Sequence, residues 1–111
     1  MKIEKQRVGT VEVLTPIGAL VDEDARQFSN ALMTRLRSAN PRVVVSLHEV
    51  PYVDSAALEG LLDATEELAG GAGALKLAGL SPTCREVLEL TGIAPRFRLF
   101  NEVHDAVKSF L

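Results

Sequence analysis

The sequence predicts an α/β fold: a mixed central β-sheet, opened by an N-terminal hairpin and continued by parallel strands, with about four amphipathic helices. Three observations support this class. Short apolar segments alternate with longer helical patterns along the 111 residues. Residues 42–47 (RVVVSL) form a nearly continuous β-branched run, which is typical of a central strand covered on both faces. Gly9-Thr10 separates two strand-like segments, as in a tight hairpin. Strands joined by helices favour parallel pairing through right-handed crossovers.

The N-terminal part is expected to form the hairpin and a possible third strand. Residues 1–8 and 11–15 are the two hairpin strands, the second with alternating Val and Glu. Pro16 and Gly18 break the regularity, so residues 17–20 are expected to form a short third strand or an edge segment.

A first helix is expected to begin at the acidic residues 22–24, since negative charge is favourable near a helix N-terminus. Asn40-Pro41 ends this helix before the central strand. Its buried face is expected to consist of Ala25, Phe28, Leu32 and Leu36.

The C-terminal half is expected to continue the alternation of helices and strands. A second helix starts at Ser55 and stops at the AGGAG run of residues 69–73, and residues 74–78 (ALKLA) alternate as a strand. Ser81-Pro82 is a strong helix start, with serine as N-cap and proline at the first helical position. A last strand at residues 97–100 and a final helix capped by Asn101 complete the chain.

Length and composition limit the possible functions. A chain of 111 residues predicts one domain, spanning residues 1–111. No apolar run approaches the roughly 20 residues of a membrane span, and no secretory leader is apparent, so we expect a cytoplasmic protein without membrane insertion. The net charge of −3 and the 5% aromatic content argue against direct nucleic-acid binding.

Residues that carry catalytic or metal chemistry are sparse. His48 and His104 have no metal-ligand spacing, so neither a metal nor a cofactor is expected. Cys84 could be activated near the N-terminus of the third helix. It also lies on that helix's apolar stripe, where a free cysteine behaves as a small buried residue, and this interpretation is favoured.

The segment 50–60 (VPYVDSAALEG) is the most informative one for function. It leads from a buried strand into a helix N-terminus, the edge of an open α/β sheet where functional groups gather. Ser55 there would present its hydroxyl at the positive end of the helix, and the small Ala56 and Ala57 would let a partner approach closely. The structural alternative is that Asp54 or Ser55 serves only as an N-cap.

The whole chain resembles the STAS domain of bacterial anti-sigma factor antagonists. Around Asp54-Ser55-Ala56-Ala57-Leu58 the family has D-S-S-G-L or D-S-A-G-L, so Ser55 matches its phosphorylatable serine and Ala57 replaces its glycine. Gly18 and Leu20 match an earlier motif in which Val21 replaces an aspartate, and Asp22 follows one place later. Residues 73–97 are close to the family's long G-x-x-L-x-L-x-G-x-S run.

The resemblance implies an antagonist that acts by partner switching. The unphosphorylated domain would bind an anti-sigma factor that is a serine kinase with a GHKL-type ATP site, which frees a sigma factor. Phosphorylation of Ser55 would end binding, and a phosphatase would reset the protein. The implied partner-binding residues are Asp22, Asp54, Ser55, Ala56, Ala57, Leu58 and Glu59. The protein is not expected to be an enzyme, and a monomer is expected, with weak dimerisation left open.

STAS domains without phosphoryl transfer give the alternatives. Some bind the ATPase of a lipid-transport ABC system, and others are scaffold subunits of stress-sensing complexes. The replacements at Val21 and Ala57 keep these alternatives open.

Overall fold

The computed structural model describes residues 1–69, 71 and 73–111. The elements in chain order are β1 (Lys2–Val8), β2 (Val11–Ile17), α1 (Asp22–Leu36), β3 (Arg42–Ser46), α2 (Ser55–Glu67), β4 (Ala74–Ala78), α3 (Pro82–Leu90), the 3-10 turn η1 (Ala94–Arg96), β5 (Arg98–Phe100) and α4 (Val103–Lys108). Residues 70 and 72, part of the run predicted to end the second helix, lie outside the described residues.

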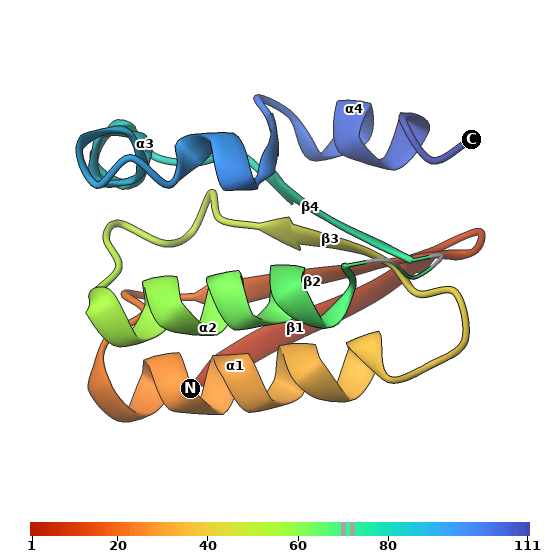
Figure 1. Cartoon of the computed structure of the whole chain (residues 1–111), viewed down its shortest axis with the longest axis horizontal. Helices are drawn as coiled ribbons and strands as arrows, with labels where there is room; N and C mark the ends of the chain where they lie inside the picture. The colour runs from red at the N-terminus through yellow and green to blue at the C-terminus, as the bar shows by residue number, and fades with distance from the viewer. Residues whose placement is uncertain (70, 72) are drawn as a thin grey trace.

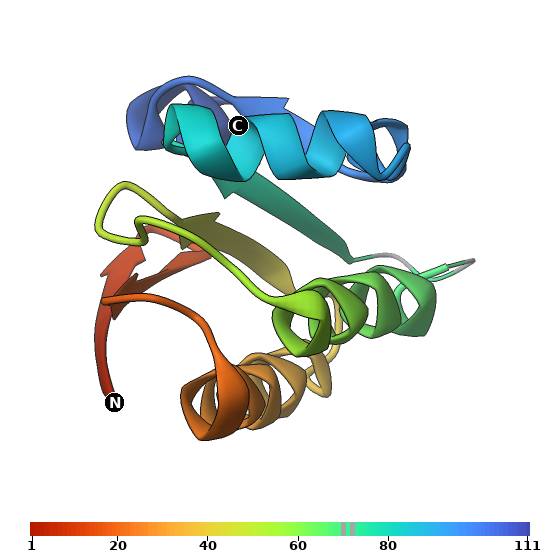
Figure 2. The ribbon, with the colours of Figure 1, turned by 90° about the vertical axis from the view of Figure 1, so that its left-hand side faces the viewer.

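The five strands form one sheet in the order β1-β2-β3-β4-β5. β1 and β2 are antiparallel and all later pairs are parallel, which confirms the predicted mixed sheet. Because each parallel strand is added beside the previous one, the right-handed crossovers carry α1, α2 and α3 to the same face. Figures 1 and 2 show α1 and α2 side by side on that face and α4 on the other.

Both faces of the sheet are buried. Val43 and Val45 of β3 point into the larger core with Phe28 of α1, whereas Val44 between them points into a smaller core under α4. This is the arrangement predicted from the β-branched run. The predicted inner face of α1 is buried as a set: Ala25, Phe28, Leu32 and Leu36. No helix in the described ranges combines the length and apolar character needed to cross a bilayer.

A buried lysine fastens α4 to the sheet. Lys76 of β4 is 4% exposed, donates a hydrogen bond to the Ser109 hydroxyl at 2.6 Å, and places its ammonium 3.8 Å from the centre of the Phe110 ring. Burial lowers the pKa of Lys76, and the neighbouring Arg98 and Arg42 add to this effect. The C-terminal segment thus covers a cation that would otherwise lie on the open face of the sheet.

The structure corrects two local predictions. No third strand forms at residues 17–20: β2 continues to Ile17, and Leu20 makes only an isolated bridge to Val53. Pro16 is tolerated within β2 because the pairing with β3 ends at Leu14, so the proline interrupts no parallel ladder. Asn101 does not cap the last helix. Glu102 is the N-cap, and the Asn101 side chain accepts a hydrogen bond from Arg85.

Gly60 sets the spacing between α1 and α2. A Cβ atom at this position would lie 1.9 Å from the Ser29 hydroxyl oxygen and 3.0 Å from the Ser29 Cβ on the facing helix. The two helices therefore pack at a distance that only glycine permits here.

A leucine at this contact is expected to force the helices apart. Gly60→Leu should lower the free energy of unfolding by about 2 kcal/mol, within the usual range for overpacking. Asp63→Leu, at an exposed position of the same helix, should stay within about 0.5 kcal/mol of the wild type. Urea unfolding measures both. Equal stability of the two variants would contradict the close packing at Gly60.

Candidate functional site

The candidate site lies at the carboxyl end of β3, where two connectors run together. The Leu20 N–H donates to the Tyr52 carbonyl at 3.1 Å, and the Asp54 N–H donates to the Leu20 carbonyl at 3.0 Å. Leu20 is fully buried, so this pairing is anchored in the core. The connector that enters α1 and the one that enters α2 therefore deliver the two helix N-termini to the same place.

The Asp54 carboxylate joins these two N-termini. Its Oδ1 accepts the backbone N–H of Ala57 at 2.9 Å, which makes Asp54 the N-cap of α2. Its Oδ2 accepts the backbone N–H of Asp22, the first residue of α1, at 2.8 Å. One carboxylate thus satisfies a free donor of each helix and adds negative charge where both helix dipoles favour it.

These contacts hold Asp54 in its charged form. Hydrogen bonds from the N–H groups of Asp22 and Ala57 lower the pKa of the Asp54 carboxyl below its ordinary value of 3.8, although desolvation acts in the opposite direction. The carboxylate is therefore ionised throughout the physiological pH range.

Asp22 contributes through its backbone. It adopts a left-handed conformation with φ of 49°, which is uncommon for a residue other than glycine but tolerated by aspartate. The preceding Val21, the N-cap of α1, makes no side-chain capping bond. The carboxylate that caps this helix end thus comes from Asp54, 32 residues further along the chain.

Ser55 is exposed at the first position of α2, beside the capping carboxylate. Ala56 and Glu59 are also exposed and Leu58 is half-buried. Ala57 is only 2% exposed and belongs to the larger core, so its side chain supports the helix rather than facing a partner directly. The surface around the serine hydroxyl is therefore small and acidic, with Asp22 exposed close by.

Tyr52 is a surface residue that the sequence interpretation did not single out. It is 50% exposed, two residues before the capping aspartate, and its backbone is held by Leu20. The sequence does mark this residue: it is the single tyrosine of the chain, and it stands between Pro51 and Val53 in the connector before α2. Exposed tyrosines are common anchors at protein interfaces.

The remaining candidate residues do not converge on this site. Cys84 is buried, and its thiol donates to the Val50 carbonyl at 3.6 Å, which is the core role that its place on the apolar stripe predicts. Ser81 caps α3 as predicted. The His48 ring is hydrogen-bonded to Ser46, and His104 is exposed on α4. Within residues 1–69, 71 and 73–111, no three His, Cys, Asp or Glu side chains are grouped as metal ligands.

The capping carboxylate predicts a pH dependence of stability. Because the pKa of Asp54 is lower in the folded state, its contribution is present above the unfolded value and is lost as pH falls through the folded value. Asp54→Asn should be less stable than the wild type at pH 6, and this difference should shrink as the pH falls below 3.8. Urea unfolding at a series of pH values measures the difference.

Asp63→Asn is the matched control, since it removes the same charge from the exposed middle of α2. It should change the stability at pH 6 much less than Asp54→Asn does. A constant difference between wild type and Asp54→Asn from pH 6 to pH 3 would contradict the role given to the charged carboxylate.

Comparison with known proteins gives the family. The STAS domain model matches residues 2–106. A Bordetella bronchiseptica protein named "Putative anti-sigma factor antagonist BtrV" is 27% identical over 110 residues, covering 99% of this chain and 95% of that protein.

Solved structures show the same fold at lower identity. An anti-sigma factor antagonist from Mycobacterium paratuberculosis superposes with a TM-score of 0.86 at 22% identity, covering 97% of this chain and 92% of that one. The unphosphorylated antagonist SpoIIAA gives a TM-score of 0.79 at 19% identity, with 98% and 96% covered. Because the family model matches nearly the whole chain, the protein belongs to the STAS domain family.

Proposed function

We propose that this protein is an anti-sigma factor antagonist that acts by partner switching, with Ser55 as the phosphorylated residue. The observation that carries the proposal is the exposed Ser55 at the first turn of α2, beside the Asp54 carboxylate that fixes this turn. The name of the Bordetella relative supports an anti-sigma factor as the partner. The protein itself would act by binding, in the cytoplasm, rather than as an enzyme.

The partner would be an anti-sigma factor that is also a serine kinase with a GHKL-type ATP site. In its binding state the antagonist occupies this factor and frees the sigma factor. The kinase then transfers the γ-phosphoryl group of ATP to the Ser55 oxygen, releasing ADP and the hydroxyl proton. A phosphatase would hydrolyse the phosphoserine and return the protein to its binding state.

The local structure explains why phosphorylation would leave the fold intact. A helix N-terminus tolerates negative charge, and Ser55 lies at the positive end of α2. The capping bond to Ala57 uses the Asp54 side chain rather than the Ser55 hydroxyl, so a phosphate would displace no capping group. The added charge would therefore act on the surface of the domain and not on its core.

The same charge would weaken a tight interface. A phosphate brings a charge of about −2 and a strong hydration shell to a surface that already carries Asp54, Asp22 and Glu59. Burying it without new cationic partners would be costly. A loss of about 3 kcal/mol in binding free energy lowers affinity more than a hundredfold, which is sufficient for a switch.

One observation favours a second candidate function. The α1 N-cap is Val21, which makes no side-chain cap, where the family motif usually has an aspartate. A STAS subunit that binds a transporter ATPase or a stress-complex scaffold, without phosphorylation, would not need that carboxylate. In that case the partner would bind regardless of the state of Ser55.

Phosphorylation of Ser55 is tested with the kinase itself. Immobilised wild-type protein captures its partner from a lysate of the source organism, and the captured kinase is identified by mass spectrometry and then purified. With radiolabelled ATP, wild type should be labelled and Ser55→Ala should not. Ser38→Ala, which removes an exposed serine beyond the C-terminus of α1, should be labelled like the wild type.

Binding then separates the two candidate functions. Ser55→Ala should bind the captured partner as tightly as wild type, and Ser55→Asp at least tenfold more weakly, about 1.4 kcal/mol. Labelling that persists in Ser55→Ala would contradict the assigned residue. Capture of a transporter ATPase or scaffold, with equal affinity for all three proteins, would replace partner switching with the second function.

Tyr52 is expected to be an anchor of the same interface. Tyr52→Ala should weaken binding to the purified partner by about tenfold or more, because truncating an exposed aromatic anchor removes a large contact area. The free energy of unfolding of the Tyr52→Ala variant should change little, since half of Tyr52 is already exposed. Val8→Ala, an exposed apolar residue at the hairpin end of the sheet, is the control. If Tyr52→Ala and Val8→Ala bind alike, Tyr52 lies outside the interface.

A further inference from the structure

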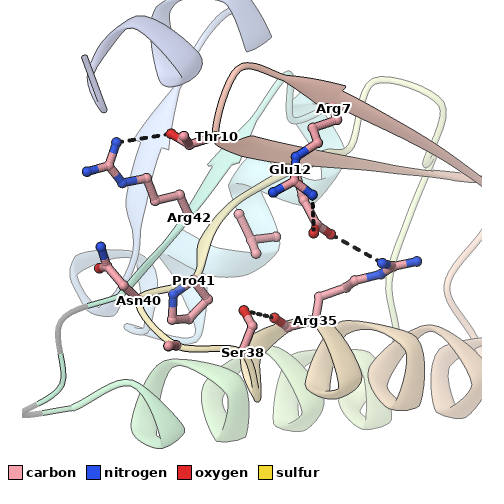
Figure 3. A pocket seen from close by; sticks show the side chains of 10 residues that line it. Arg7, Thr10, Glu12, Arg35, Ser38, Asn40, Pro41 and Arg42 are labelled. Atoms are coloured by element: carbon pink, nitrogen blue, oxygen red, sulfur yellow. Dashed lines mark hydrogen bonds and ion pairs between the residues drawn. The ribbon is translucent and has the colours of Figure 1, made fainter.

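A polar hollow lies at the end of the sheet opposite Ser55. It has a volume of about 460 Å³ and is framed by the β1–β2 hairpin, the C-terminal end of α1 and the turn into β3 (Figure 3). Arg42 and Val43, at the amino end of β3, form part of its wall, whereas the Ser55 site follows the carboxyl end of that strand. The two sites are thus separated by the length of the sheet.

The charges that line this hollow are unbalanced. Among its described residues, the charged ones are Arg7, Arg35 and Arg42 with the single acid Glu12. Arg7, Arg35 and Glu12 together carry a charge of +1, and Arg42 adds a further positive charge beside them, in a chain whose net charge is −3. A smaller hollow of about 180 Å³ shares Arg7, Glu12 and Arg35 and adds Lys5. Positive charge is therefore concentrated here against the overall balance of the protein.

Glu12 orients two of these arginines without saturating them. Its carboxylate lies 3.3 Å from the Arg7 Nη1 and 3.5 Å from the Arg35 Nη1, one oxygen to each. Figure 3 shows Glu12 between the two side chains. A guanidinium carries five N–H donors, so each arginine keeps most of its donors for another group. The side chain of Arg35 is 35% exposed. Water and salt therefore screen its charge less than they screen the charge of a fully exposed arginine.

The Arg42 guanidinium lies on the α4 face of the sheet, because side chains alternate along β3 and Arg42 shares the face of Val44. Its Nη1 donates to the Thr10 hydroxyl at 3.2 Å and to the Phe110 carbonyl at 3.4 Å. Asn40, in a left-handed conformation with φ of 53°, adds an amide group to the lining. Arg42 therefore adds positive charge beside the hollow, whereas the donors that Glu12 holds in place before any ligand arrives belong to Arg7 and Arg35, which lowers the entropic cost of binding.

We infer that this hollow is a binding site for a small organic oxyanion, a molecule carrying phosphate or carboxylate groups. The planar guanidinium matches both groups with paired N–H donors, and the excess of positive charge favours an anion. The volume lies within the range of small-molecule sites. Glu12 would accept from a hydroxyl of the ligand. This inference goes beyond the proposed partner switch and does not depend on it.

The test uses pyrophosphate and citrate as separate probes of the phosphate and carboxylate classes. Each is titrated into isotope-labelled full-length protein, with the arginine Nε–H and backbone signals followed by NMR. The signals of Arg7 and Arg35 should shift together with at least one probe, and added salt should weaken that binding. The probe that binds more tightly identifies the class of ligand.

Three variants locate the site. Arg7→Gln and Arg35→Gln should each weaken binding of that probe by about fivefold or more, as expected for loss of a charge-assisted hydrogen bond. Arg7 is 67% exposed on its side chain, so its replacement keeps the fold even if that of Arg35 does not. Arg26→Gln removes the same charge from an exposed arginine of α1 that is paired with Glu23, and should bind like wild type.

Two results would overturn the inference. One is the absence of any shift at these arginines with either probe at about 10 mM, well above the concentration at which a weak millimolar site fills. The other is equal weakening by Arg7→Gln and Arg26→Gln, because this would show a general response to net charge rather than a site.

Discussion

The carboxylate of Asp54 is the contact on which the arrangement of the candidate site depends. Two helices that leave the sheet from different strands begin beside each other, and each has backbone N–H groups without partners inside its own helix. Oδ1 of Asp54 takes one such group from Ala57 and Oδ2 takes another from Asp22. A single side chain thus neutralises the positive ends of both helices and fixes their relative position at the surface.

The remaining contacts around Asp54 make this position rigid. The backbone pairing of Leu20 with the segment before Asp54 is anchored by a side chain with no exposure to solvent. Further along, Gly60 lets α2 approach Ser29 of α1 more closely than any other residue would. The helices are held both at their N-termini and along their length, so Ser55 is presented by a platform that has little freedom to rearrange.

A rigid platform suits a switch that works through charge. If Ser55 lay in a flexible loop, phosphorylation could act by ordering or disordering that loop. Here the residue is already in the first turn of a capped helix, where a phosphate is compatible with the helix dipole. The proposed switch therefore rests on the difference between a small neutral surface and a doubly charged one, next to a carboxylate that stays ionised because its pKa is low.

Most of the fold could be predicted from local patterns, whereas the contacts of the site could not. The β-branched run of β3, the apolar face of α1 and the Ser81-Pro82 start of α3 are signals within a few residues, and the structure confirms all three. The role of Ser55 stays a prediction from its motif, and the structure places the residue exposed at the first position of α2. The bond from Asp22 to Asp54 joins residues 32 positions apart through a backbone N–H, which leaves no signature in the residue types. The extension of β2 through Pro16 likewise depends on where its partner strand ends.

The most direct test of the central claim is an NMR titration that follows the Asp54 carboxyl carbon together with the amide protons of Asp22 and Ala57. If one carboxylate holds both helix ends, the carboxyl should titrate below 3.8, and both amide signals should move with the same midpoint as their shared acceptor is protonated. An unshifted carboxyl, or amide signals that do not follow it, would contradict the account.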